Sequence, residues 1–347
     1  MTLQERIDVM VALGDHLRRD NDEFLEALQK RTQFHNDWFT LEHQRASLMA
    51  IADAFLRREK LEAWVRNYAI PDWPAPKAVG SSAPKTIGLV LAGNIPLVGF
   101  HDVLSVFIAG HRSLIKLSSK DEYVMPYLLK LLAKYDKRTE TYFTLTDRLE
   151  GFDAVIATGS NNSSRYFEAY FGRYPHVIRK NRNAVAVLRG DETTEDFRAL
   201  GRDIFEYFGL GCRNVSKLYV PEGYDFNPLL EVLHEWKTLQ NHTKWKNNFD
   251  YNYALTTLNK ENFYLSGPLM IVENDQIASR IATLHYSTYR DVSSLEEELR
   301  NRREEIQLIA APDGFLSLPT FPFGRAQRPG LTDYADGVDT LAFLQEL

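Results

Sequence analysis

The sequence predicts an α/β protein with two parallel-sheet α/β domains and a helical N-terminus. From residue 86 onward, short apolar runs alternate with longer segments of helical periodicity, which is typical of right-handed βαβ units on a parallel sheet. A second, less regular series of apolar runs follows residue 212, and the first 70 residues have helical periodicity throughout. These observations divide the chain into a helical region and two sheet-forming regions.

The N-terminal region, residues 1 to about 70, is expected to be helical. Apolar residues recur three and four positions apart in IDVMVALGDHL and RASLMAIADAFL, with charged residues between them. The stretch IPDWPAPKAVGSSAPK at 70–85 is rich in Pro, Gly and Ser, so we interpret it as a connector.

The first sheet-forming series begins with the strand TIGLVLAG. It continues with the helix IPLVGFHDVLSVFIAG, the strand SLIKLS, the helix EYVMPYLLKLLAKY, the strand FDAVIATGS, the helix NSSRYFEAYFG and the strand NAVAVLRG. A helix in DETTEDFRALGRDIFEYFG and a strand in SKLYV then enclose a glycine-rich loop, and PLMIVEN, IATLHYST and EIQLIAAP are further strands. Residues 236–265 mix polar and aromatic residues without a clear period. Sheets of this kind bind ligands beyond the carboxyl ends of their strands.

Composition excludes several classes of protein. The 347 residues are 44% hydrophobic and 25% charged, which is ordinary for a globular protein. The net charge of −6 argues against nucleic acid as a main partner, and no window approaches the roughly 18 apolar residues of a membrane span. A single cysteine excludes an internal disulfide framework, and the charged N-terminus is no signal peptide, so a cytoplasmic location is expected.

That cysteine, Cys212, lies in the loop GLGCRNVSK between a predicted helix and a predicted strand. Two interpretations stay open at this point. Free cysteines are commonly small, buried and unreactive. Neighbouring glycines, however, let the backbone approach a substrate closely, and the adjacent Arg213 would favour the thiolate.

Polar residues also follow three of the predicted strands. Asn94 comes after the first strand in LAGNIP, where its amide could donate to an oxyanion or cap the next helix. Lys116 ends the second strand, and Gly159 and Ser160 separate a later strand from its helix, where N–H groups could meet phosphate or ribose. Each feature is weak alone, but their order along the chain, followed by Cys212, is informative.

In this order the residues resemble the aldehyde dehydrogenase superfamily and, within it, the LuxC-type acyl-CoA or acyl-protein thioester reductases. GLVLAGNIPLVGFHDVLSVFIAGHRSLIKLSSKD looks like that family's signature block, and GRAQRPGLTDYADGVDTLAFL looks like its C-terminal block. The resemblance implies an aldehyde-dehydrogenase-like fold. It further implies a nicotinamide-cofactor domain of residues 1–188 plus about 321–347, and a catalytic domain of residues 189–320.

The resemblance also implies roles for individual residues. Cys212 matches the catalytic thiol, and Asn94 matches the side-chain amide of the oxyanion hole. The residues implied in cofactor binding are Lys116, Ser118, Ser119, Gly159 and Ser160. No metal ligands are expected.

Two departures from the family pattern are informative. The hydrolytic members carry a Glu general base upstream of the cysteine, where this chain has VIRKNRNAVAVL, with Ile178 or Arg179 and no carboxylate. Without a base to activate water, a thioacyl-enzyme is left for exchange with another thiol. In addition, Ser119, followed by Lys120, stands where a Glu would repel a 2′-phosphate, which favours NADPH over NADH.

The expected activity is therefore reduction of an acyl-CoA or acyl-carrier thioester to an aldehyde with NADPH, or else NADH, through a thioacyl-Cys212 intermediate. Two other classes stay open: an acyltransferase or thioesterase that uses Cys212 without reduction, and a non-catalytic subunit on a dehydrogenase scaffold. Analogy with the superfamily implies a homo-oligomer.

Overall fold

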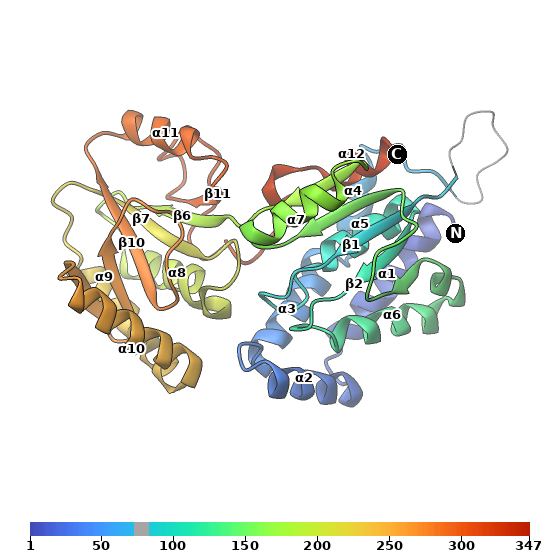
Figure 1. Ribbon diagram of the computed structural model, residues 1–347, viewed down its shortest axis with the longest axis horizontal. Coiled ribbons are helices and arrows are strands. Elements are labelled where there is room, and N and C mark those ends of the chain that lie inside the picture. Colours follow the sequence, from blue (N-terminus) through green and yellow to red (C-terminus); the bar gives the residue numbers. More distant parts are fainter. Residues whose placement is uncertain (73–82) are drawn as a thin grey trace. The chain divides into compact units, whose positions relative to one another are not determined.

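The computed structural model describes residues 1–72 and 83–347, which form two compact units. The first unit comprises Met1–Lys180 and Pro329–Leu347, and the second comprises Asn181–Arg328. Each unit contains its own sheet with helices around it (Figure 1). This arrangement, with helices leading into the first sheet, confirms the predicted fold class. Residues 73–82 of the predicted connector lie outside the described residues.

The first unit begins with four helices, within the region predicted to be helical: α1 (Leu3–Arg18), α2 (Glu23–His35), α3 (Leu41–Ala54) and α4 (Arg58–Val65). Side-chain caps fix the starts of the first three of these helices, whereas α4 has no side-chain cap. Thr2 and Glu5 form a capping box at α1, because each side chain accepts from the other's backbone N–H. The side chains of Asp22 and Thr40 cap α2 and α3 in the same way, so polar residues determine where these helices begin.

The sheet of the first unit has the strand order β3-β2-β1-β4-β5, and every pair in it is parallel. Its elements are β1 (Thr86–Val90), α5 (Phe100–Ala109), β2 (Arg112–Lys116), α6 (Val124–Tyr135), η1 (Lys137–Thr141), β3 (Phe143–Leu145), β4 (Ala154–Thr158), α7 (Asn161–Phe171) and β5 (His176–Arg179). Right-handed crossovers put α5 and α6 on one face and α7 on the other. The order reverses direction between β1 and β4, which makes their carboxyl ends the topological switch point.

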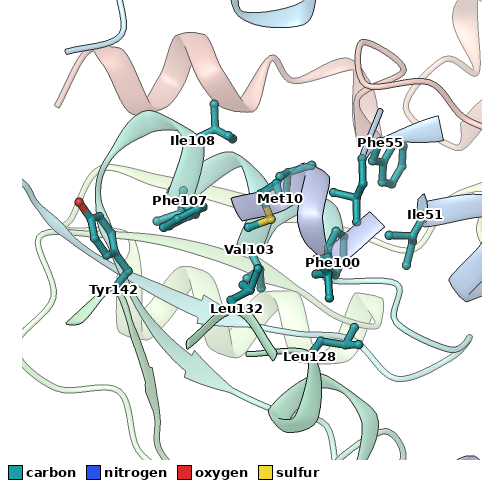
Figure 2. Packing of buried hydrophobic residues seen from close by; sticks show 14 of the residues in the cluster. Met10, Ile51, Phe55, Phe100, Val103, Phe107, Ile108, Leu128, Leu132 and Tyr142 are labelled. Carbon is teal, nitrogen blue, oxygen red and sulfur yellow. The ribbon is translucent and has the colours of Figure 1, made fainter. Parts of the chain in front are cut away.

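The core of the first unit lies between its sheet and the N-terminal helices (Figure 2). Met10 of α1, Phe107 of α5 and Leu128 of α6 are fully buried in it. In α5 every side chain except that of His101 is buried, because the helix lies between the sheet and the helical layer. An apolar helix of this kind can be stable only inside a core.

The C-terminal segment of the chain, residues 329–347, belongs to the first unit and contains η4 (Ala335–Gly337) and α12 (Thr340–Gln345). The His111 ring bonds to the Leu344 carbonyl at 3.0 Å, and the Tyr68 hydroxyl donates to the Asp339 carboxylate at 2.6 Å. Burial lowers the pKa of His111, so this ring is a structural anchor that stays neutral.

The second unit has a six-stranded sheet of order β11-β6-β7-β10-β9-β8, in which β8 runs antiparallel to β9 and the other pairs are parallel. Its elements are β6 (Asn183–Val187), α8 (Thr194–Phe205), η2 (Glu206–Gly209), β7 (Val215–Pro221), α9 (Asn227–Leu233), η3 (His234–Asn241), α10 (Thr243–Leu258), β8 (Phe263–Ser266), β9 (Leu269–Glu273), β10 (Thr283–Tyr289), α11 (Val292–Asn301) and β11 (Ile306–Ala310). The three strands predicted after the cysteine loop are confirmed as β9, β10 and β11. Throughout the described parts of both units, every helix is too short or too polar to span a bilayer.

Candidate active site

Cys212 lies in a tight turn between η2 and β7, and its side chain is half-buried. Two hydrogen bonds close the turn. The Asn214 N–H donates to the Gly211 carbonyl at 3.0 Å, and the Gly211 N–H donates to Asn214 Oδ1 at 2.8 Å. Cys212 and Arg213 are the two central residues, so the backbone is held on both sides of the thiol.

Asn214 ties this turn to the end of α8. Its side chain is almost completely buried, and Nδ2 donates to the carbonyls of Asp203 at 3.0 Å, Ile204 at 3.4 Å and Glu206 at 2.8 Å. The last carbonyls of a helix have no partners within the helix. Asn214 supplies those partners and thereby anchors the cysteine turn to a rigid element.

Between α8 and the turn, three consecutive residues have left-handed backbone conformations: Tyr207 (φ 53°), Phe208 (φ 56°) and Gly209 (φ 68°). Left-handed conformations cost a residue with a side chain roughly 1–2 kcal/mol each. Both aromatic side chains are buried, and burial of such large rings offsets this cost. The reversal brings the chain from the end of α8 to the cysteine turn.

A second segment of the same unit lies beside the turn. The buried Asp203 carboxylate accepts from the N–H groups of Gly324 at 2.6 Å and Ala326 at 3.0 Å. Arg213 Nε donates to the Ala326 carbonyl at 2.5 Å, and its guanidinium lies 4.8 Å from the centre of the Phe321 ring. Burial raises the pKa of Asp203 to about 6, against the lowering effect of the two N–H donors.

Asn94 belongs to the first unit and lies half-buried in the irregular segment that follows β1. It does not cap α5, because that helix begins at Phe100 and its N-cap is Gly99. The helix expected over IPLVGFHDVLSVFIAG therefore begins later than predicted, at Phe100. Leu97 has a left-handed backbone (φ 55°), and its N–H donates to the Asp121 carboxylate at 2.7 Å, which delays the start of the helix.

Lys116 ends β2 beside the end of β1, and its side chain is exposed. Ser118 and Ser119 follow in the next loop, the first half-buried and the second exposed. The loop packs tightly on Gly93, because a Cβ atom added there would lie 2.3 Å from Ser118 Oγ. Only glycine allows the segments after β1 and β2 to approach this closely.

Gly159 and Ser160 join β4 to α7. Ser160 is the N-cap of α7, and its hydroxyl accepts from the Ser163 N–H at 3.2 Å. A Cβ atom added to Gly159 would lie 2.8 Å from a ring carbon of Phe167, so a glycine is required for helix α7 to pack there. The Ser160 hydroxyl thus has a structural partner in addition to any ligand contact.

The first unit brings its predicted site residues to one edge of its sheet. Asn94, Lys116 and Gly159 follow β1, β2 and β4, which are neighbouring parallel strands that end at the same level. This edge contains the topological switch point, where open α/β sheets bind ligands. Cys212 belongs to the second unit.

Beside Lys116 the first unit has an open hollow of about 700 Å³. Aromatic rings from α7, including the exposed Tyr166 and Tyr170, form part of its wall together with two arginines, Arg148 and Arg173. The remaining lining residues are Val90, Leu149, Glu150, Gly151, Phe152, Phe167, Phe171 and Tyr174. The hollow therefore combines apolar rings with positive charge.

The sequence model of the acyl-CoA reductase (LuxC) family matches residues 1–234 of this chain. The chain belongs to the LuxC acyl-CoA reductase family. The resemblance seen in the sequence is thereby confirmed, and the chain falls among the oxidoreductases that act on aldehydes or acyl-CoA. No sequence match to a curated protein was found.

Solved structures of two aldehyde dehydrogenases and of an NADP-dependent enzyme resemble this LuxC-family chain. Aldehyde dehydrogenase 21 from Physcomitrella patens, in complex with the reaction product succinate, has a TM-score of 0.69 at 14% identity; the match covers 100% of this chain and 84% of that one. An NADP-dependent enzyme of E. coli has a TM-score of 0.65 at 14% identity, covering 93% and 80%. An NAD-dependent aldehyde dehydrogenase from Sinorhizobium meliloti has a TM-score of 0.64 at 13% identity, covering 91% and 71%. At these identities the likeness shows the aldehyde dehydrogenase fold.

Two features of the LuxC-family chain were missed from the sequence. The hollow beside Lys116 could have been suspected from the aromatic-rich segment SRYFEAYFGRY. Its rings recur four residues apart, at Tyr166 and Tyr170 and at Phe167 and Phe171. The anchoring of the cysteine turn by Asn214 has a weaker signal, a single Asn two residues after the cysteine. A lone Asn in a loop has many ordinary roles, so its partners become visible only in the fold.

Proposed function

We propose that this protein reduces an acyl thioester, with acyl-CoA as the first candidate, to an aldehyde with NADPH. Cys212 is the nucleophile. The observation that carries this proposal is the placement of the single cysteine at the centre of a turn anchored on both sides, in a chain of the acyl-CoA reductase family. A half-buried thiol in a fixed backbone is suited to repeated attack on one substrate carbon.

In the first half of the reaction, the Cys212 thiolate attacks the thioester carbonyl carbon. A new carbon–sulfur bond forms, the carrier thiolate leaves, and the acyl group remains on Cys212. We assign Asn94 as a side-chain amide donor to the developing oxyanion, together with the N–H of Cys212. The place of Asn94 after β1, at the sheet edge that contains the topological switch point, supports this assignment.

In the second half, the thioacyl group on Cys212 becomes a thiohemiacetal, which collapses to aldehyde and regenerates the thiolate. When bound, the nicotinamide supplies the hydride for this step. The protein holds the acyl group in place and stabilises the oxyanion. Where the hydrolytic general base is expected, this chain has Ile178 or Arg179 rather than a carboxylate, so we propose that water is not activated there and the acyl group persists for reduction.

The first unit has a surface that fits a dinucleotide. Its hollow offers rings for a base and the cations Lys116 and Arg173 for phosphates, whereas Arg148 is paired there with Glu150 at 2.9 Å. Gly159 and Ser160 lie at the N-terminus of α7, where free N–H groups favour anionic ligands. We therefore propose that the first unit binds the cofactor through Lys116, Ser118, Ser119, Gly159 and Ser160, and that the second unit carries the thiol.

The preference for NADPH over NADH is also a proposal. Ser119 and Lys120 are both exposed after β2, so a hydroxyl and an ammonium group can meet a 2′-phosphate there. The arginines of the hollow add positive charge to the same unit. These side chains support the proposed preference for a cofactor with a phosphorylated ribose.

The proposal is tested by the intact mass of the protein after incubation with a panel of acyl-CoAs, first without and then with NADPH. The expected result is an acyl adduct on Cys212 that disappears when NADPH is added, with release of aldehyde. The C212A variant should form no adduct but still bind NADPH. An adduct that persists with NADPH and with NADH would favour the transferase alternative, and no adduct with any donor would overturn the proposal for acyl-CoA.

A further inference from the structure

We propose that Asn214 is the positioning residue for the Cys212 thiol: it holds the cysteine turn in its reactive geometry by bridging the two ends of the left-handed segment that precedes it. This inference rests on the proposed function for its effect on turnover. Its effect on the thiol itself does not depend on any substrate.

The hydrogen bonds of Asn214 span that left-handed segment. On the upstream side, Nδ2 donates to carbonyls at the end of α8, of which Glu206 is the last before Tyr207. On the downstream side, Oδ1 accepts from the N–H of Gly211, directly before Cys212. One side chain therefore connects the chain before the reversal to the chain after it.

The reversal needs such a connection because its backbone is under strain. Tyr207 and Phe208 both have left-handed conformations, which residues with side chains adopt at a cost. Strained segments persist where the surroundings over-determine them, and they are common beside reactive groups. Removal of the Asn214 bonds would let the segment relax, and the turn that carries Cys212 would move with it.

The position of Asn214 keeps it from acting directly on substrate. Its side chain is 1% exposed, and both its oxygen and its nitrogen are occupied by backbone groups. Asn214 therefore acts through the backbone on either side of Cys212. A displacement of about 1 Å in a reacting group can lower a rate about 100-fold, so small relaxations of the turn are sufficient for a large effect.

The test uses alkylation by iodoacetamide, which reports on Cys212 alone because the chain has no other cysteine. The variants are N214D, which keeps an acceptor for the Gly211 N–H but loses the donor, and N214A, which loses both. The matched control is N252D. Asn252 is also buried in the second unit, and its Nδ2 donates to the Ile281 carbonyl at 2.9 Å rather than to a carbonyl of the cysteine turn.

We expect the pH profile of alkylation to move to higher pH in N214D, because the new carboxylate near the turn disfavours the thiolate. The alkylation rate of N214A should also differ from that of the wild type. In both variants kcat for thioester reduction should fall at least about tenfold, with a smaller change in KM. N252D should keep the wild-type alkylation profile, even where its unfolding midpoint falls as far as that of N214D.

Wild-type alkylation kinetics in a folded N214A variant would overturn the proposal, because the effect of N214D would then be one of charge. If N214A does not fold, N214D decides: an unchanged profile overturns the proposal. A changed alkylation rate in folded N214A, together with a wild-type protein that no acyl-CoA acylates, would sustain the positioning role and reject the proposed function. Wild-type alkylation kinetics in folded N214A, together with acylation of the wild-type Cys212 by an acyl-CoA, would reject the positioning role and sustain the proposed function.

Discussion

The Arg179 guanidinium donates to the Asp102 carboxylate at 2.6 Å, and both side chains are almost completely buried. Arg179 also donates to the Thr340 hydroxyl at 3.1 Å, so this ion pair joins β5, α5 and α12 within the first unit. The segment VIRKNRNAVAVL, which has no carboxylate at Ile178 or Arg179, thus contains a structural cation. We infer that this part of the chain is used for stability.

Replacement of Asp102 by Asn should lower the free energy of unfolding by about 3–5 kcal/mol, because it leaves the Arg179 charge buried without its partner. The control is E168Q, which breaks the exposed ion pair between Glu168 and Lys180 and should cost less than about 1 kcal/mol. Urea unfolding measures both. Equal losses in the two variants would contradict the structural role of the buried pair.

Asp121 should give stability a distinct dependence on pH. Burial raises its pKa from 3.8 to about 6, with the Leu97 N–H acting in the opposite direction. Between these two values the folded state keeps a proton that the unfolded state has released, so the contribution of Asp121 to stability decreases as pH rises. Relative to D121N, the wild type should lose on the order of 3 kcal/mol between about pH 4 and pH 7. Urea unfolding across this range tests it, and a constant difference between the two proteins would refute it.

The close approach of Gly93 and Ser118 predicts a specific rescue. In G93A the new Cβ would lie 2.3 Å from Ser118 Oγ and 2.6 Å from Ser118 Cβ, so the variant should lose about 1–3 kcal/mol of stability. Adding S118G removes both contacts and should restore most of the loss. G330A, where the nearest atom is 3.5 Å away, is the control for a Gly-to-Ala change in the same unit. Thermal unfolding of the wild type and these three variants tests the prediction, and a double variant no more stable than G93A would argue against this contact.

If Ser119 faces a 2′-phosphate, S119E should change the preferred nicotinamide. The ratio of kcat/KM for NADPH to that for NADH should fall at least about tenfold, because a hydrogen bond to a charged group contributes about 1.5–3 kcal/mol and the carboxylate would repel phosphate. S119A separates loss of the hydroxyl from gain of charge and should cause a smaller change. A ratio unaffected by S119E would place the 2′-hydroxyl away from Ser119.

Long periodic elements of the fold could be predicted from the sequence because burial alone determines them. The helical character of the first 70 residues and the strands β1, β2, β4 and β6 follow from the spacing of apolar residues. The strand β3 was missed because three residues, Phe143–Leu145, are too few to show a period. Helix α10 was missed because it leaves aromatic residues such as Tyr251 exposed, which removes the amphipathic signal.

From the sequence, the residues of the candidate site and their order along the chain could be predicted, but most of their tertiary surroundings could not. Asn94, Lys116 and Gly159 each follow a recognisable strand, so their common sheet edge follows from parallel topology. The setting of Cys212 could not be predicted in this way. Its turn depends on hydrogen bonds from Asn214 to carbonyls up to eleven residues away and on a segment near residue 324, and such tertiary partners have no local pattern.

Because residues 329–347 return to the first unit, they affect the order in which the two units can fold during synthesis on the ribosome. The second unit is continuous in sequence, from Asn181 to Arg328, so all of its strands emerge together. The first unit must wait for α12, which supplies Thr340 to Arg179 and the Leu344 carbonyl to His111. Domains generally fold as units during synthesis. The unit that emerges first is therefore completed last, with its ion pair and histidine anchor among the final contacts to form.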